Sequence, residues 1–280
     1  MMGRVTCFGV ALALGGLPAC GTRDRPLDPR SSQPAVTVQE VIYAAPDGEA
    51  LQADLYRPAG DGPFPALVLV HGGGWHGGRR GEMHRGAMRL ARHGYLALSI
   101  DYRMAPGARF PAALCDAADA LTWLAALPGV DAQRLGAWGY SAGAHLVALL
   151  ALREPALTAC RRPRLPVVKA AVVGGTPSDL FHFDNFVVRN FVGGSPQQLP
   201  DRYALASPAR RVLPGAPPFF LYHGRRDALV PAEQSERLAA ALGRAGVPYE
   251  YLERPGGHSH TLRRDEETHR RALAFLARWL

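Results

Sequence analysis

Strand-like and helix-like segments alternate along this chain from residue 35 onward, and this alternation restricts its fold more than any other feature. Several of the strand-like segments are apolar throughout, which is typical of strands in a parallel sheet covered by helices on both faces. The helix-like segments carry apolar residues at helical spacing. With 280 residues and no internal repeat, the chain is long enough to form one such domain. We therefore predict an α/β fold with a mostly parallel central sheet flanked by helices.

The predicted elements follow this pattern, and the first two strands are expected to form an antiparallel hairpin through Pro46-Asp-Gly48. Strands are predicted at residues 36–43, 50–56, 66–71, 95–101, 135–139, 167–174, 218–223 and 249–252. Helices are predicted at residues 81–93, 111–127, 142–152, 232–245 and 266–280. An irregular, aromatic-rich stretch occupies residues 176–214.

The N-terminal segment has the composition of an export signal. Arg4 precedes an apolar stretch at residues 5–17, which is too short to span a bilayer as a stable anchor. The following sequence, Leu17-Pro-Ala-Cys20, resembles a bacterial lipobox, in which the cysteine is lipidated and becomes the new N-terminus. The leucine three residues before the cut fits ordinary signal peptidase less well, because that enzyme prefers a small side chain there.

Three regions are therefore predicted: a lipoprotein-type signal peptide at residues 1–20, a flexible tether at 21–34 and the folded domain at 35–280. The mature protein is expected to be exported and anchored to a cell membrane through Cys20, on the periplasmic or cell-surface side. Plain secretion is the alternative.

The other chemical features of the composition are less specific. Cys115 and Cys160 are the cysteines of the domain, and in an oxidising compartment they can pair, but the sequence leaves this open. The net charge of +8 comes almost entirely from arginines that are scattered over different elements. A nucleic-acid surface would gather cations on one face with interleaved aromatic residues, so no nucleic-acid partner is expected.

The sequence Gly139-Tyr-Ser141-Ala-Gly143 lies between a predicted strand and a predicted helix. It matches G-x-S-x-G, the tight turn that exposes a nucleophilic serine, and its glycines permit a sharp bend and close packing. Without this context the pattern is weak, and Ser141 would only cap the helix. The strand-turn-helix context favours Ser141 as a nucleophile, with Tyr140 beside it in the pocket.

A second glycine-rich sequence, His71-Gly-Gly-Gly-Trp75, directly follows a predicted buried strand. Successive glycines leave backbone N–H groups uncovered, so that these groups can stabilise the negative charge that develops when a serine attacks a carbonyl. We expect the amides of Gly73, Gly74 and Ala142 to form this oxyanion hole. His71 is expected to brace the loop, and Trp75 to form either a pocket wall or part of the core.

An acid and a histidine follow Ser141 in the order that a catalytic triad of this type requires. Asp227 lies just beyond the predicted strand at 218–223, where a carboxylate can orient a base. Two histidines, His258 and His260, follow the last predicted strand, and local chemistry does not choose between them. A His-x-His pair can bind zinc, but no further ligands stand at a recognisable spacing, so no metal is expected.

At these motifs the chain resembles the α/β-hydrolase fold. It is similar to the hormone-sensitive-lipase-like carboxylesterases with an HGGGW motif, which include small microbial acyl, acetyl and feruloyl esterases. The tail departs from the commonest ending of this group, Gly-x-Gly-His-Gly-Phe. Instead, Gly257-His-Ser-His260-Thr resembles the Gly-x-x-His-Thr ending of isoprenylcysteine-methylesterase-like members. This resemblance assigns the base to His260 and leaves His258 as the second choice.

The resemblance implies that Ser141 attacks an ester carbonyl, that His260 is the general base and that Asp227 orients it. An acyl-enzyme would form and be hydrolysed without a metal or an organic cofactor. An arylformamidase-like or peptidase-like amide hydrolase needs the same residues and remains an alternative. A lipid-anchored binding protein that has lost catalysis is a third possibility, although such a protein usually has a damaged triad.

The resemblance also implies a small lid inserted at residues 178–194. Four phenylalanines of this region either line an acyl or aryl pocket or form the buried side of a short helix: Phe181, Phe183, Phe186 and Phe191. A lid of this size seats a short-chain or aryl ester rather than a long-chain lipid.

Overall fold

The computed structural model of the chain describes residues 35–280, apart from residues 154, 161–164 and 259–264. The described residues belong to one compact unit. The predicted signal peptide, Cys20, the tether and His260 lie outside the described residues. Within the described ranges, no helix is long and apolar enough to cross a membrane.

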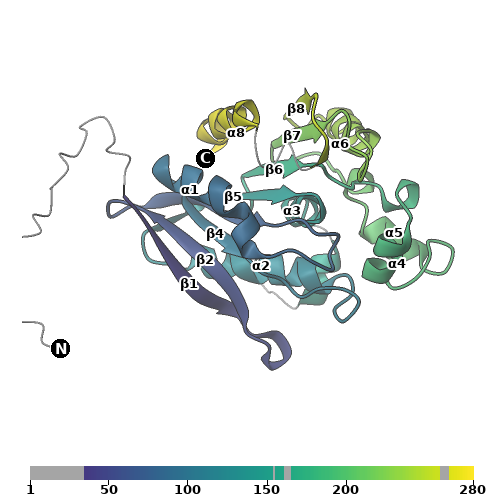
Figure 1. Cartoon of the computed structure of the whole chain (residues 1–280), viewed down its shortest axis with the longest axis horizontal. Coiled ribbons are helices and arrows are strands. Elements are labelled where there is room, and N and C mark those ends of the chain that lie inside the picture. The colour runs from purple at the N-terminus through teal and green to yellow at the C-terminus, as the bar shows by residue number, and fades with distance from the viewer. Residues whose placement is uncertain (1–34, 154, 161–164, 259–264) are drawn as a thin grey trace, which may run out of the picture. The chain divides into compact units, whose positions relative to one another are not determined.

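Eight strands form one sheet in the order β1-β2-β4-β3-β5-β6-β7-β8, from the purple hairpin at one edge to β8 at the other (Figure 1). The strands are β1 (Val36–Ala44), β2 (Leu51–Pro58), β3 (Phe64–Val70), β4 (Leu96–Ile100), β5 (Val130–Tyr140), β6 (Ala170–Gly174), β7 (Phe219–Gly224) and β8 (Tyr249–Arg254). β2 pairs antiparallel with both β1 and β4, whereas all other pairs are parallel. This confirms the predicted entry hairpin and the mostly parallel sheet.

Helices cover both faces of this sheet. One face carries α1 (His84–Arg92) and α8 (Glu266–Trp279), and the other carries α2 (Ala112–Ala125), α3 (Ala142–Ala151) and α6 (Glu233–Arg244). Strand β3 illustrates the consequence for the sequence. Leu67 and Leu69 pack in the layer of α1 and α8, whereas Val68 and Val70 pack in the other layer, and all four are fully buried. Both faces need apolar side chains, so the strand is apolar without alternation.

The irregular stretch between β6 and β7 contains short helices that the sequence pattern did not predict. They are η4 (Leu180–His182), α4 (Phe186–Val192), α5 (Pro200–Leu205) and η5 (Pro208–Arg210). The α4 helix begins where the Asn185 side chain accepts a hydrogen bond from the Val188 N–H, and it ends at Gly193 in a left-handed conformation, with φ of 104°. Helices of two turns or less carry too few residues for a periodic signal. The remaining short elements are η1 (Pro46–Gly48), η2 (Arg80–Met83) and η3 (Pro155–Cys160).

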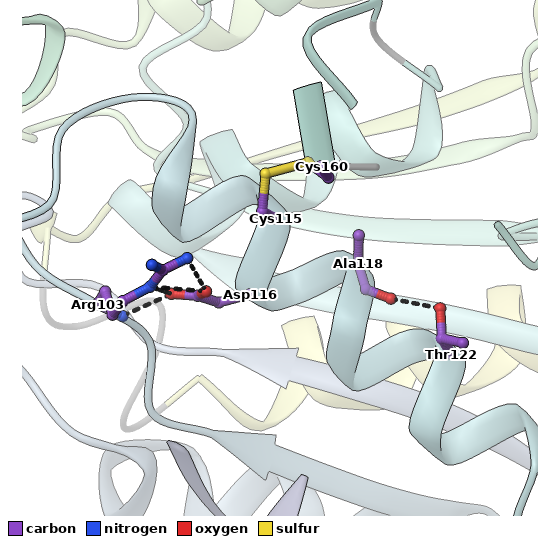
Figure 2. The surroundings of a disulfide bond; sticks show 6 residues. All are labelled: Arg103, Cys115, Asp116, Ala118, Thr122 and Cys160. Carbon is purple, nitrogen blue, oxygen red and sulfur yellow. Dashed lines mark hydrogen bonds and ion pairs between the residues drawn. A yellow bond between two sulfur atoms is a disulfide. The ribbon is translucent and has the colours of Figure 1, made fainter. Parts of the chain in front are cut away.

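A disulfide joins Cys115 of α2 to Cys160 at the end of η3, with the two Cα atoms 5.2 Å apart (Figure 2). The pairing that the sequence left open therefore exists in the structure. The neighbouring residue Asp116 is fully buried and accepts hydrogen bonds from the guanidinium and the backbone N–H of Arg103. The disulfide and the Asp116–Arg103 hydrogen bonds attach α2 to two different parts of the chain. The loop that the disulfide closes, from Cys115 to Cys160, contains Ser141.

Replacement of Cys115 and Cys160 together by serine is expected to lower the free energy of unfolding by about 4 kcal/mol, because the disulfide restricts the unfolded chain by closing a long loop. The loop has a sequence separation of 45 residues. Urea denaturation of the oxidised protein and of the double variant measures the difference. Reduction of the native protein should give the same loss. Coincident denaturation midpoints, together with two free thiols in the native protein, would contradict this expectation.

Candidate active site

The predicted site residues meet because the strands that precede them are neighbours in the sheet. β3 and β5 are adjacent, with Val70 opposite Gly139, so the glycine loop after β3 reaches the turn after β5. β7 and β8 are also adjacent, and Asp227 and His258 follow them. Parallel strands all present their carboxyl ends at one edge of the sheet, which is where open α/β sheets form their binding sites.

Ser141 occupies a strained turn between β5 and α3. Its backbone has φ of 54° and ψ of −123°, a conformation that residues with a side chain rarely adopt. The Ser141 N–H donates to the Gly174 carbonyl over 2.7 Å, which ties the turn to the end of β6. A Cβ atom on Gly139 would overlap the backbone of Gly143, and one on Gly143 would overlap the Val70 carbonyl. Both glycines of the motif are therefore sterically required.

The loop after β3 also depends on glycine. Gly73 and Gly74 have φ values of 111° and 61°, and a Cβ atom on Gly73 would overlap the backbone of Gly77. The Gly73 carbonyl accepts hydrogen bonds from the N–H groups of His76 and Gly77, over 3.2 and 3.0 Å. In the backbone hydrogen bonding of the described residues outside helices and strands, the Gly73 and Gly74 N–H groups donate to no carbonyl. The Ala142 N–H is the first amide of α3 and has no intrahelical partner.

His71 braces this loop, as the sequence predicts. Its Nδ1 lies 2.6 Å from the Gly72 carbonyl oxygen, so Nδ1 carries the proton and donates it. The ring is fully buried and stacks on Tyr102 with the centroids 4.4 Å apart. Burial lowers the pKa of His71 and keeps the imidazole neutral. The residue is thus a neutral structural support at the base of the glycine loop.

Trp75 lines the cavity and is also part of the core, so both predicted roles apply. It stacks on Phe191 with ring centroids 4.4 Å apart, and its Nε1–H donates to Nδ1 of His145 over 3.3 Å. His145 in turn donates from Nε2 to the Ala206 carbonyl over 2.7 Å. Complete burial lowers the pKa of His145 to about 4, so this imidazole stays neutral. It links the Trp75 indole to the Ala206 carbonyl through two hydrogen bonds.

Asp227 lies between two imidazoles in the connection after β7. Its Oδ2 is 2.6 Å from Nδ1 of His258 and 3.2 Å from Nε2 of His223, and its Oδ1 accepts from the Leu229 and Val230 N–H groups. Burial opposes ionisation of this carboxyl, but the hydrogen bonds from the two histidines and from Val230 outweigh it. The pKa of Asp227 is therefore held well below its usual range, and the group is a carboxylate.

The histidine bonded to Asp227 is His258, the second choice of the two predicted bases. His260, the first choice, lies outside the described residues. Tyr140, predicted in the pocket, is absent from the cavity lining and donates from its hydroxyl to the His258 backbone carbonyl. Sequence reasoning missed His223, although it is an imidazole at the end of the aromatic and apolar strand that precedes Asp227.

A cavity of about 680 Å³ opens over Ser141. The catalytic candidates on its wall are Ser141, His258 and the three predicted oxyanion residues Gly73, Gly74 and Ala142. The remaining wall is formed by Trp75, His76, Gly77, Pro177, Phe183, Asn185, Phe186, Val187, Leu229 and Val230. Phe186 and Leu229 are 76% and 67% exposed, so they form an apolar rim. No group of three His, Cys, Asp or Glu side chains in the described part of the chain is arranged to hold a metal ion.

The four phenylalanines of the predicted lid divide between the two expected roles. Phe183 and Phe186 line the cavity. Phe191 is buried against Trp75, and the Phe181 ring packs beneath the guanidinium of Arg210 at 4.4 Å. For Phe186 and Phe191 helical geometry explains the difference, because the two residues lie on different sides of α4.

Comparison with known proteins identifies the family to which this chain belongs. The family model of BD-FAE matches residues 53–242, which include the glycine loop, the Ser141 turn and Asp227. The chain belongs to the BD-FAE family. This result and the relatives described next confirm the predicted relationship to α/β-hydrolase carboxylesterases of the hormone-sensitive-lipase-like group.

The BD-FAE chain is 35% identical over 245 residues to esterase LipC of Mycobacterium tuberculosis, an alignment that covers 80% of this chain and 60% of LipC. It therefore spans about three fifths of the length of this curated relative. Its fold is similar to that of Est2, a thermophilic esterase of Thermogutta terrifontis with bound propionate, with a TM-score of 0.74 and 26% identity over 90% of this chain and 97% of Est2. Esterase 2 of the same species, phosphoramylated by tabun, matches with a TM-score of 0.72, 26% identity and the same coverage.

Proposed function

We propose that the protein is a serine hydrolase that cleaves carboxylic esters through an acyl-enzyme on Ser141. The observation that carries this proposal is the cavity whose wall contains Ser141, His258, Gly73 and Gly74, with His258 bonded to Asp227. The esterase relatives LipC and Est2 support the reaction class.

The proposed reaction begins when His258 takes the proton of Ser141 at its Nε2 while Ser141 Oγ attacks the ester carbonyl. Asp227 accepts the Nδ1–H of His258, which sets Nε2 as the basic nitrogen and stabilises the imidazolium that forms. The amides of Gly73, Gly74 and Ala142 donate to the oxyanion. His258 then protonates the leaving alcohol, and water hydrolyses the acyl-enzyme with the same histidine as base.

The preferred substrate is proposed to be a short-chain or aryl ester. The cavity wall near Ser141 is largely apolar, and Phe186 and Leu229 give it an apolar rim. The cavity volume of about 680 Å³ is in the ordinary range of small-molecule sites. The propionate-bound structure of Est2 supports a short acyl group.

The test is hydrolysis of p-nitrophenyl esters from acetate to dodecanoate by the folded protein. We expect kcat/KM to be highest for acetate to butyrate and to fall at least about tenfold for dodecanoate, in line with the propionate bound in the structure of Est2. A fluorophosphonate probe should modify the peptide that contains Ser141. Turnover of aryl formamides without turnover of any ester would replace this proposal by the amide hydrolase. Absence of both turnover and labelling would favour a binding protein.

We further propose that the protein is exported and held at a cell membrane by a lipid on Cys20, on the periplasmic or cell-surface side. The apolar segment and the Leu17-Pro-Ala-Cys20 sequence support this location. The Cys115–Cys160 disulfide supports an oxidising compartment.

Mass spectrometry of the N-terminal peptide is expected to find Cys20 diacylated or triacylated in the membrane fraction of a bacterial host. Replacement of Cys20 by serine should prevent lipidation, whereas the matched variant Cys7→Ser should leave it intact. Mature protein in the soluble fraction with an unmodified Cys20 would instead indicate plain secretion.

A further inference from the structure

A second histidine, His223, contacts the same carboxylate oxygen as His258. His223 lies in β7, four residues before Asp227, and its side chain is fully buried. Its Nε2 is 3.2 Å from Oδ2 of Asp227, whose side chain is 1% exposed. His258 meets this oxygen from the cavity, and His223 meets it from the interior of the domain. The mechanism described above gives His223 no role.

The neighbours of His223 define its tautomer. Nε2 lies 2.9 Å from the Val230 carbonyl oxygen, which can only accept a hydrogen bond, so Nε2 carries the proton. Nδ1 lies 2.6 Å from Oγ of Ser235 in α6, whose hydroxyl can donate to it when the ring carries its proton on Nε2 alone. The Nε2–H thus lies between the Val230 carbonyl and Asp227. Ser235 is itself fully buried, so this arrangement is fixed on both sides of the ring.

The hydrogen bonds of Asp227 restrict rotation of its carboxylate. Oδ1 accepts from the N–H groups of Leu229 and Val230, each over 2.9 Å. Oδ2 lies 3.2 Å from His223 Nε2, whose N–H it shares with the Val230 carbonyl at 2.9 Å. These three donors come from the interior and from the loop that carries the acid. Together they fix the plane of the carboxylate and direct the remaining acceptor position of Oδ2 toward His258. Charged acceptors hold such donors more strongly than neutral ones do.

We propose that His223 is a positioning residue for catalysis: its Nε2–H holds Oδ2 of Asp227 in the orientation that His258 requires, and Ser235 fixes the tautomer that makes this possible. The proposal rests on the proposed triad of Ser141, His258 and Asp227. His223 never touches the substrate. It acts through Asp227, so its loss should lower kcat more than it raises KM.

Two substitutions separate this role from simple filling of the core. In His223→Gln the amide nitrogen reaches the position of Nε2 and can still donate to Asp227. In His223→Asn the shorter amide reaches only the position of Nδ1, so Ser235 keeps a partner but Asp227 loses its donor. Both variants place a smaller polar group in the same buried site, and they differ mainly in the contact with Asp227.

With p-nitrophenyl acetate, His223→Asn is expected to lower kcat by about 10- to 100-fold, the range for loss of a hydrogen bond to a charged group, with KM changed by less than about threefold. His223→Gln should retain kcat within about threefold of the native protein. Unchanged kcat in folded His223→Asn would overturn the proposal. Equal losses in both variants would also overturn it, since a structural histidine is not rescued by a donor at one position.

Nuclear magnetic resonance of the native protein with ¹⁵N-labelled histidine provides a test that does not depend on turnover or on how the variants fold. His223 is expected as the neutral Nε2–H tautomer, with its resonances assigned through their absence from the His223→Gln spectrum or, if that variant does not fold, through the backbone. A neutral Nδ1–H tautomer would overturn the proposal. Failure of the proposed esterase function can be distinguished from failure of the His223 proposal, because in the first case the native protein would show no turnover that depends on Ser141.

Discussion

Replacement of Ser141 by alanine is expected to lower kcat/KM for p-nitrophenyl acetate by about 10⁴-fold or more, because no acyl-enzyme can form without the hydroxyl. The backbone turn should survive, since Ser141 has its N–H bonded to Gly174 and alanine has the same Cβ atom. The oxyanion amides would remain, so residual turnover above the uncatalysed rate is expected. Steady-state kinetics with a check of thermal stability measure the effect.

A matched control for this substitution is Ser195→Ala. Ser195 lies in the loop before α5, where its Oγ accepts a hydrogen bond from the Gln198 N–H over 3.4 Å, and it does not line the cavity. Its loss should leave kcat/KM within about twofold, as for a surface change away from the site. Turnover that persists at the native rate in a pure Ser141→Ala preparation would show that another group performs the chemistry.

Replacement of His258 by alanine is expected to lower kcat by about 10⁴-fold or more, similar to the loss of the serine, because the two residues act as a unit. The reason is the 2.6 Å contact between His258 Nδ1 and Asp227 Oδ2, which orients this imidazole on the cavity wall. His260→Ala is the matched variant two residues away and is expected to stay within about fivefold of the native kcat. The double variant of Ser141 and His258 should be little worse than either single variant.

The variants His258→Ala and His260→Ala distinguish the two candidate bases, because only the variant that lacks the base should lose activity. A large loss in His260→Ala with activity retained in His258→Ala would restore the assignment made from the isoprenylcysteine-methylesterase-like ending. Addition of imidazole offers a further check, because a small base can enter the space that His258→Ala leaves and restore part of the rate.

The motifs that were predicted correctly are those whose chemistry is local. Gly139 and Gly143 are required because a Cβ atom at either position would overlap backbone within the same turn or the adjoining strand. The apolar run in β3 likewise follows from burial on both faces. Such constraints act on consecutive residues, so the buried strands, the Ser141 turn and the glycine loop could all be inferred from the sequence alone.

The choice between His258 and His260 is not local, because it depends on which imidazole reaches Asp227, 31 residues from the first of them in sequence. The same holds for the Cys115–Cys160 pair, which requires α2 and η3 to be adjacent. The partners of His223 lie only 4 to 12 residues away, but they belong to the loop after β7 and to α6, so the pattern of the strand alone does not record these contacts. The sequence by itself therefore determined the architecture and the kind of chemistry, since these depend on periodicity and on steric limits within a turn. Only the tertiary structure decided which histidine meets the acid and what holds that acid in place, because hydrogen bonds between side chains of different elements and loops depend on distances that no local pattern records.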